Sequence, residues 1–404
     1  MPTTRLRRLA VLPATALVLA GLAVLGPVAA PAAAEPGCLS EAVTGQALPG
    51  ILGATCDDEV PPVVDGEVVV TPAPRAQGWV GSKQLTFSFT GRFTDADADA
   101  LGFQCQLSSR TTADQPWTAC GTYDAAAEVW RQSYNGLEES EALPYTFRVR
   151  AVDTGDAARD PRSTCGLGCS TARTDLDDVS APATVQVRVD TVAPAGSVRV
   201  NGLVDEENPT WPMVTSRTLQ VVLGAGGSQD RSPVGFSCTL TGRAVPCALG
   251  PTDLRDLPPG DQRFEAVARD AAGNVDPTPS VLTFSVPRDL AAPKRSGWKQ
   301  VRQGGYFDGD FLQTTRLGAT VSAPGRNVRE LRLVAPRGPG LGKVSVRVGQ
   351  GRWYTVDLGG PSYERFHVYQ VRDQFEPLVS GRVQVRAAEL GRGETVRVDA
   401  VLAH

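Results

Sequence analysis

The sequence predicts an all-β protein made of several β-sandwiches in a row. Its 404 residues contain many short runs in which apolar and polar residues alternate, separated by Gly, Asn, Asp and Pro. In Arg263–Val286 one alternating run leads into an Asp/Gly/Asn turn and a second alternating run follows directly. A related pattern occurs about 120 residues earlier, at Tyr145–Pro161. Alternation with a period of two, bounded by turn residues and without a helical period, is typical of hairpins in half-buried antiparallel sheets.

Residues 1–34 are predicted to be a secretory signal peptide. A basic start with three arginines precedes the apolar run Leu9–Ala30, and Ala32–Ala34 offer small residues for cleavage before Glu35. A membrane anchor is the alternative, but Pro and Gly interrupt the run. No later stretch approaches the ~20 apolar residues that a membrane span needs. The mature chain is therefore expected to be secreted and extracellular, with no membrane span after signal removal.

The charge of the chain disfavours nucleic acid as a partner. The formal net charge is -4, from 40 Lys and Arg against 44 Asp and Glu. Removal of the three arginines of the signal peptide makes the mature chain more acidic, at about -7. Binding to a phosphate backbone depends on basic stripes that release counterions, and no such stripe is expected here.

Eight cysteines in an exported chain are expected to form disulfides. They fall into four couples that are close in sequence: Cys38/Cys56, Cys105/Cys120, Cys165/Cys169 and Cys238/Cys247. A bridge that closes a loop of about 15 residues contributes roughly 3 kcal/mol. Zinc is the alternative, but zinc needs four Cys or His ligands, and both histidines, His367 and His404, are far along the chain from every cysteine.

The strands group into successive segments. Residues 35–73 contain one cysteine couple and several Pro and Gly, which indicates a linker or an edge strand. Residues 74–190 and 191–293 repeat one order: an early strand, a strand that carries a cysteine, a later alternating strand and a closing strand. Residues 294–404 have no cysteine but contain 10 of the 25 aromatic residues. This last segment is expected to be a separate sandwich with its own core.

Several motifs of the second repeat occur in a recognisable order. They are Phe236-Ser-Cys238, Leu257-Pro-Pro-Gly260, Phe264-x-Ala266-x-Ala268 and the turn Asp270–Pro279. In this order they resemble the bacterial immunoglobulin-like repeats of secreted and cell-surface proteins. The resemblance is fullest over residues 191–293, whereas residues 74–190 depart from it at the insert that holds Cys165 and Cys169. It implies tandem immunoglobulin-like β-sandwiches that act as spacers, as adhesive stalks or as companions of binding or catalytic modules, with no common site residues.

The last segment is similar in outline to another class of module. Its alternating runs, such as Val344–Val348 and Tyr354–Leu358, are separated by glycine turns. The segment resembles the jelly-roll β-sandwich modules at the ends of bacterial surface proteins, and also carbohydrate-binding modules. The resemblance implies a jelly-roll-like binding module at the C-terminal end.

No catalytic motif stands out in the sequence. It lacks a Gly-x-Ser-x-Gly elbow, HExxH, a P-loop and a dinucleotide fingerprint, and it implies no cofactor. His367 lies in an alternating run and is expected to be structural, and His404 is the last residue of the sequence. Aspartate and glutamate are plentiful, so a carboxylate pair of the glycosidase type is not singled out.

Two Asp-rich turns, Asp95–Asp99 and Asp270–Asp276, are the candidates for a calcium site. Counted from Asp95, an EF-hand loop requires Gly at the sixth position and Glu at the twelfth, where Ala100 and Gln106 stand. Asp and Asn in turns commonly accept hydrogen bonds from their own backbone. No metal site is therefore predicted.

Aromatic residues of the last segment form the candidate ligand site. Sugars stack on exposed aromatic rings while nearby polar side chains bind their hydroxyls. Alternation places Trp353 on the polar face of its strand with Thr355 and Asp357, and a large apolar group on a polar face requires an explanation. The candidate ligand-binding residues are Trp353, Tyr354, Asp357, Tyr363 and Tyr369. Packing within the core or between sheet and loop is the alternative for these rings.

These features predict a secreted, non-enzymatic bacterial surface or extracellular protein. The immunoglobulin-like repeats would act as spacer or adhesive modules, and the last segment would bind a glycan or another cell-surface component. The alternatives are a carbohydrate-binding accessory protein, an extracellular hydrolase with its site in the C-terminal segment, and a purely structural stalk.

Overall fold

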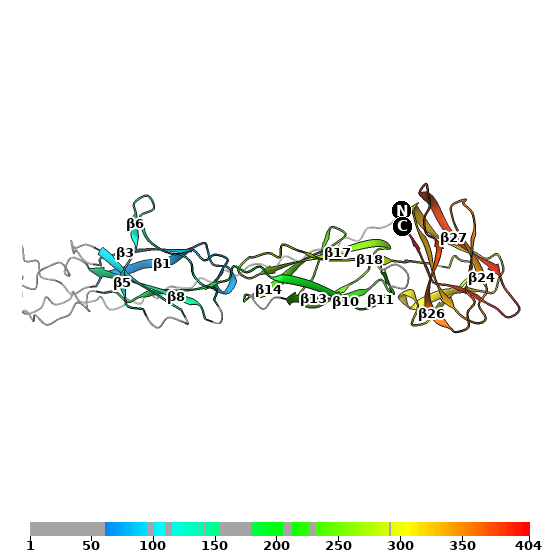
Figure 1. Cartoon of the computed structure of the whole chain (residues 1–404), viewed down its shortest axis with the longest axis horizontal. Coiled ribbons are helices and arrows are strands. Elements are labelled where there is room, and N and C mark those ends of the chain that lie inside the picture. The colour runs from blue at the N-terminus through cyan, green and yellow to red at the C-terminus, as the bar shows by residue number, and fades with distance from the viewer. Residues whose placement is uncertain are drawn as a thin grey trace, which may run out of the picture.

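The computed structural model is an all-β chain in which three units lie in a row (Figure 1). The structure describes residues 61–94, 101–109, 115–140, 143–153, 179–204, 212–226, 231–290 and 292–404. The regular elements of these ranges are strands, with short 3-10 turns at Ala76–Gly78 and Phe307–Gly309. The prediction of an all-β fold made of sandwiches is confirmed.

The first unit is a sandwich of two sheets. One sheet has the order β1 (Val63–Thr71), β3 (Leu85–Arg92), β7 (Val129–Tyr134), β6 (Thr122–Asp124). The other has the order β2 (Trp79–Val80), β9 (Ala183–Val189), β8 (Tyr145–Asp153), β4 (Leu101–Ser108), β5 (Thr118–Ala119). Alternate residues of the strands point inward, and the rings of Phe87 and Phe147 stack between the sheets with centroids 4.0 Å apart.

The second unit repeats this plan. Its smaller sheet has the order β10 (Ala195–Val200), β13 (Leu219–Gly226), β16 (Gly250–Leu254). Its larger sheet has the order β11 (Leu203–Val204), β12 (Met213–Val214), β18 (Ser280–Val286), β17 (Gly260–Asp270), β14 (Val234–Leu240), β15 (Arg243–Val245). Strands β17 and β18 form the hairpin that the alternation in Arg263–Val286 predicts, with Phe264 opposite Leu282. Phe264 and Phe284 are fully buried in the core.

The terminal unit contains three sheets. The first has the order β19 (Arg288–Asp289), β29 (Ala400–Ala403), β23 (Leu331–Arg337), β26 (Glu364–Arg372). The second has the order β20 (Lys299–Arg302), β21 (Asp310–Thr314), β28 (Val396–Val398). The third has the order β22 (Thr320–Val328), β27 (Val379–Glu389), β24 (Lys343–Val348), β25 (Tyr354–Asp357). We call this third sheet the distal sheet.

The sheet that contains β23 is buried on both faces. Leu331 and Leu333 of β23 pack into the core of the terminal unit, whereas Val334 joins the hydrophobic cluster of the second unit. The side chains of strand β29 also point to both sides: Val401 packs in the terminal core, and Leu402 packs in the cluster of the second unit.

The distal sheet covers the other side of the terminal core. Its edge strand β22 still adjoins the second unit, because Pro324 lines a small groove with Pro259 and Val286, whereas β24 and β25 lie two and three strands away from β22. In Figure 1, β24 accordingly lies at the end of the row.

Two of the four predicted cysteine couples are disulfides in the structure. Cys105–Cys120 joins β4 to the segment after β5, and its Cα atoms are 5.6 Å apart. Cys238–Cys247 joins β14 to the segment after β15, and its Cα atoms are 6.1 Å apart. Both bridges therefore tie the cysteine strand of a repeat to the chain that follows it, as the spacing predicts.

The other two predicted couples are not among the disulfides that the structure shows. Cys38 and Cys56 precede the first described residue, and Cys165 and Cys169 fall between residues 153 and 179, so all four lie outside the described residues. The bridges Cys38/Cys56 and Cys165/Cys169 consequently stay predictions from sequence spacing alone.

Several other features also stay predictions. The predicted signal peptide and the Asp95–Asp99 turn lie outside the described residues. The predicted segment boundaries and the jelly-roll assignment stay predictions. Among the described residues, no helix has the length and apolar character to cross a membrane.

Candidate functional site

The five predicted ligand-binding residues all lie in or beside strands β25 and β26 of the terminal unit. Trp353 immediately precedes β25, Tyr354 and Asp357 belong to it, Tyr363 immediately precedes β26, and Tyr369 lies within β26. Each has its own set of neighbours in the structure, so they do not form one aromatic cluster. Their role in binding stays a prediction, and their surroundings show what each can do.

Tyr354, Asp357 and Tyr369 have packing and turn contacts. The ring of Tyr354 meets Phe375 edge-on at 6.2 Å, and Oδ1 of Asp357 accepts a 2.9 Å hydrogen bond from the amide of Gly359. Tyr369 packs against the terminal core, and burial raises the pKa of its hydroxyl above the ordinary value. These contacts stabilise the local fold around β25 and β26.

Trp353 lies on the outer face of the distal sheet, where alternation predicted it. The guanidinium carbons of Arg347 and Arg386 lie 4.4 Å and 4.3 Å from its ring centroid. Antiparallel pairing of β24 with β25 and β27 places Ser345 opposite both Thr355 and Arg386. Each cation–π contact of this kind stabilises the arrangement by about 0.5–2 kcal/mol. We call Arg347, Trp353 and Arg386 the arginine clip.

A row of polar side chains continues from the clip along β27. Arg382, Gln384 and Arg386 alternate with the buried residues Val383, Val385 and Ala387. Nε of Arg382 donates to Oγ of Ser322 at 2.8 Å, and Nε of Arg347 donates to Oε1 of Gln384 at 2.9 Å. The three arginines are therefore held by neutral groups and a ring.

One ion pair of the distal sheet involves other residues. Nζ of Lys343 and Oε2 of Glu389 are 2.9 Å apart near one end of the sheet. Among the described residues, no carboxylate lies within ion-pair distance of Arg347, Arg382 or Arg386. Their positive charge is thus left without a partner inside the described part of the protein, which suits an anionic ligand.

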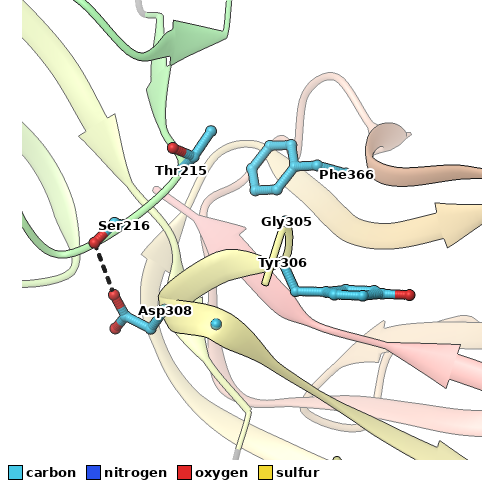
Figure 2. A pocket seen from close by; sticks show the side chains of 7 residues that line it. Thr215, Ser216, Gly305, Tyr306, Asp308 and Phe366 are labelled. Atoms are coloured by element: carbon cyan, nitrogen blue, oxygen red, sulfur yellow. Dashed lines mark hydrogen bonds between the residues drawn. The ribbon is translucent and has the colours of Figure 1, made fainter. Parts of the chain in front are cut away.

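A groove of about 600 Å³ lies at the joint between the second and terminal units (Figure 2). Figure 2 shows Phe366 of β26 pointing toward Thr215 of the second unit, while the ring of Tyr306 points away from Asp308. Oδ1 of Asp308 accepts hydrogen bonds from the amide of Arg217 at 2.7 Å and from Oγ of Ser216 at 3.2 Å. The polar groups on this wall therefore already hold the two units together.

Tyr363 belongs to the surroundings of this groove. Its hydroxyl shares a 2.7 Å hydrogen bond with the hydroxyl of Tyr306, which lines the groove, and accepts one from Nη1 of Arg397 at 2.7 Å. Burial raises the pKa of the Tyr306 hydroxyl above its ordinary value. Tyr363 is nevertheless exposed, so it is the predicted residue that can meet a ligand at the joint.

The same joint contains a group of carboxylates. Burial, together with the nearby carboxylates of Asp289 and Asp310, raises the pKa of Asp399 to about 8. Burial and the neighbouring Asp310 and Asp308 raise the pKa of Asp289 to about 6. Within the described residues, no group of three or more Asp, Glu, His or Cys side chains is arranged to hold a metal ion. The raised pKa values mean that Asp289 and Asp399 keep their protons to higher pH than ordinary carboxyl groups.

His404 connects two carboxylates from different units. Its Nδ1 lies 2.8 Å from Oδ1 of Asp261 in β17, and its Nε2 lies 3.0 Å from Oε2 of Glu330. These hydrogen bonds raise the pKa of His404 to about 9. They also lower the pKa of Glu330 to about 2 against the opposing effect of burial. His404 is therefore a protonated bridge across the joint.

The Asp270 turn behaves as the sequence predicts. Oδ1 of Asp270 accepts from the amides of Gly273 at 2.6 Å and Asn274 at 2.7 Å. Oδ1 and Oδ2 of Asp276 accept from the amides of Thr278 at 2.8 Å and Gly196 at 2.7 Å. Burial alone would raise the pKa of Asp276, but these hydrogen bonds lower it. The carboxylates of this turn therefore accept hydrogen bonds from backbone amides, which fixes the shape of the turn.

Comparison with known proteins gives remote structural similarities. No protein-family model matches the chain, and no curated protein matches it. Among solved structures, the chain is similar to fibronectin(III)-like modules of CbhA from Clostridium thermocellum, with 14% identity over 54% of this chain and 93% of that chain and a TM-score of 0.28. It is also similar to a bacterial ice-binding adhesin (12% identity, 85% and 98% covered, TM-score 0.25) and to an I-band fragment of titin (10% identity, 85% and 97% covered, TM-score 0.29).

The arginines of the clip are not singled out by any sequence pattern. Arg347 and Arg386 occupy polar positions of alternating strands, where arginine is common on solvated faces. A signal was present in the charge of the last segment, because residues 294–404 contain 18 Lys and Arg against 10 Asp and Glu. The excess is opposite in sign to the net charge of -4 for the whole chain.

Proposed function

We propose that this protein is a non-catalytic extracellular binding protein in which the first two units space the terminal unit away from its point of attachment. The observation that carries the proposal is the double burial of the sheet containing β23. Because that sheet lies between the terminal core and the cluster of the second unit, strands β24 and β25 of the distal sheet lie on the side of the terminal core away from the second unit. A ligand on a surface opposite that side would meet these strands first.

The joint between the first and second units supports a spacer role. The side chain of Asp190, which immediately follows β9, is buried and accepts hydrogen bonds from the amides of Ser232 at 2.9 Å and Arg231 at 3.3 Å. Gly81 of the first unit lies so close to the Asp270 turn that an added Cβ would be 3.2 Å from Oδ1 of Asn274. Contacts of this kind resist bending between the units.

The joint between the second and terminal units is more extensive. Strand β19, which leads out of the second unit, pairs with β29, with Asp289 opposite Ala400. Phe307 and Val334 bury apolar side chains in the cluster of the second unit. A backbone ladder and an apolar interface together favour a fixed orientation for the terminal unit.

Two measurements on the mature chain test the proposal. Small-angle X-ray scattering should give the profile of an extended rod, and the protein should be retained by isolated bacterial envelope or by immobilised polysaccharide. The proposal fails if the scattering profile is that of a compact particle, or if the protein is retained by neither material. Hydrolysis of a polysaccharide by the purified chain would favour the extracellular hydrolase instead.

A further inference from the structure

We infer that the outer face of the distal sheet binds a carboxylated polysaccharide, such as a polymer of uronic acids. The inference rests on the proposed binding function and names the ligand class of that terminal unit. It depends on the arginine clip and on the row along β27.

The charge of the terminal segment favours an acidic ligand. Residues 294–404 carry a formal charge of +8, from 18 Lys and Arg less 10 Asp and Glu, on a chain whose net charge is -4. Clustered charge of one sign raises the local concentration of oppositely charged ligands and speeds their association. The basic charge therefore favours approach of a polyanion to this end of the protein.

The arginine clip places two cations close together without an internal anion among the described residues. Each guanidinium carbon is within 4.4 Å of the same ring centroid, so the two lie at most about 9 Å apart. Like charges at this distance repel each other, and an anion bound beside the two guanidinium groups relieves the repulsion. Trp353 restricts both side chains through its ring, so less side-chain freedom is lost when a ligand binds.

The neighbouring side chains fit a sugar polymer with carboxylates. The planar guanidinium fork matches a carboxylate with two parallel hydrogen bonds, which a point charge does not reproduce. Gln384 and Thr355 provide neutral donors and acceptors for hydroxyl groups between the charges. Successive outward residues of a strand are spaced about 6.5–7 Å apart, so Arg382, Gln384 and Arg386 form an extended track along which a polymer can lie.

Nucleic acid is a poorer match for the same face. Proteins that bind single strands usually stack successive bases on successive aromatic rings. The row along β27 and the clip contain one ring, Trp353, and the guanidinium groups of Arg347 and Arg386 already contact it. A polymer that offers carboxylates and hydroxyls uses the groups that this face presents.

The test uses the mature chain and polygalacturonate as the probe, with dextran as a neutral polysaccharide and DNA and polyphosphate as phosphate polymers. Isothermal titration calorimetry at low and physiological salt should show binding to polygalacturonate that weakens with salt, and no comparable binding to dextran. The double variant R347Q/R386Q should lose about tenfold or more in affinity. The matched control R302Q/R372Q removes the same charge from exposed positions on β20 and β26, and it should bind within about twofold of the wild type.

A further variant separates positioning from charge. Trp353→Leu keeps both arginines but removes the ring that restrains them, so affinity should fall several-fold, with a small fall in melting temperature from the loss of the two cation–π contacts. The inference is overturned if polygalacturonate does not bind, if the control pair loses as much affinity as the clip pair, or if DNA or polyphosphate binds more tightly. Binding of dextran in preference to polygalacturonate would also overturn it, while leaving the proposed binding function intact.

Discussion

The side-chain amide of Asn274 donates a 2.7 Å hydrogen bond to the main-chain oxygen of Asp190. Asn274 lies in the β17–β18 turn of the second unit, and Asp190 immediately follows β9, the last strand of the first unit. The same amide nitrogen also donates to Oδ2 of Asp270 at 2.7 Å, so Asn274 links its own turn to the end of the first unit. The polar turn of the sequence therefore also forms one side of the contact between the first and second units.

Replacement of Asn274 should loosen this joint. Asn274→Ala leaves the buried carbonyl of Asp190 with one partner fewer, which should cost about 1–2 kcal/mol of interface stability. Small-angle scattering should then show a broader distribution of maximal dimensions than for the wild type. Asn201→Ala, at an exposed turn of the second unit, is the control and should leave the profile unchanged. Identical profiles for both variants would show that this hydrogen bond does not stiffen the joint.

Asp399 should make the protein less stable as the pH rises from acidic to neutral values. Its pKa in the fold is about 8, above the ordinary 3.8, so the folded state holds a proton that the unfolded state releases. Stability is therefore greatest below about pH 4 for this group and falls until the pH passes about 8. Asp399→Asn keeps an oxygen to accept the hydrogen bond from the amide of Phe307 and removes the ionisation.

The expected result of Asp399→Asn is a gain of a few kcal/mol at pH 8 and little change at pH 4. Urea unfolding at the two pH values measures it. The exposed carboxylate of Asp373 offers a matched control, because Asp373→Asn should change the free energy of unfolding little at either pH value. A loss of stability at pH 8 would mean that the Asp399 carboxylate is needed in its charged form.

His404 should contribute stability that is lost at alkaline pH. Its pKa in the fold is about 9, above the ordinary 6.5, because Asp261 and Glu330 accept its hydrogen bonds. A raised pKa in a basic group means that the contribution is complete below about pH 6.5 and disappears as the pH rises through 9. His404→Gln should lower stability by about 1–3 kcal/mol at pH 6 and by much less at pH 10.

Thermal melts of wild type and His404→Gln across this range measure the difference. His367→Gln serves as the comparison, since this histidine lies in the terminal unit near Glu364 rather than across the joint. Parallel melting curves for wild type and His404→Gln at all pH values would contradict the protonated bridge.

The fold could be predicted more completely than the candidate site, because the sequence patterns that indicate the fold involve residues close together in the chain. Alternation within Phe264–Val286 encodes which side chains face inward, and couples such as Cys238/Cys247 are close in sequence. The clip depends instead on the pairing of β24 with β27, which brings Arg347 and Arg386 to one ring from distant parts of the chain. A pattern of period two gives the face of a residue but not its neighbour across the sheet. Alternation therefore predicted the face of Trp353 and none of its partners.

Removal of the Cys238–Cys247 disulfide should affect two of the three units together. The hydrophobic cluster of the second unit includes Cys238 and also Val334 and Leu402 of the terminal unit, whereas the core of the first unit is a separate cluster. We therefore expect calorimetry of the wild type to show one transition for the first unit and one shared transition for the other two. Cys238→Ala/Cys247→Ala should cost roughly 3 kcal/mol by freeing the loop in the unfolded chain, and should lower only the shared transition.

The equivalent variant of the first unit is the matched control. Cys105→Ala/Cys120→Ala opens a bridge in the same relative position and should lower only the transition of the first unit. If the terminal unit instead melts at its own unchanged temperature in Cys238→Ala/Cys247→Ala, the apolar joint does not couple it to the second unit. The orientation of the distal sheet would then have to come from the backbone ladder of β19 and β29 and from the polar contacts of Asp308 and His404.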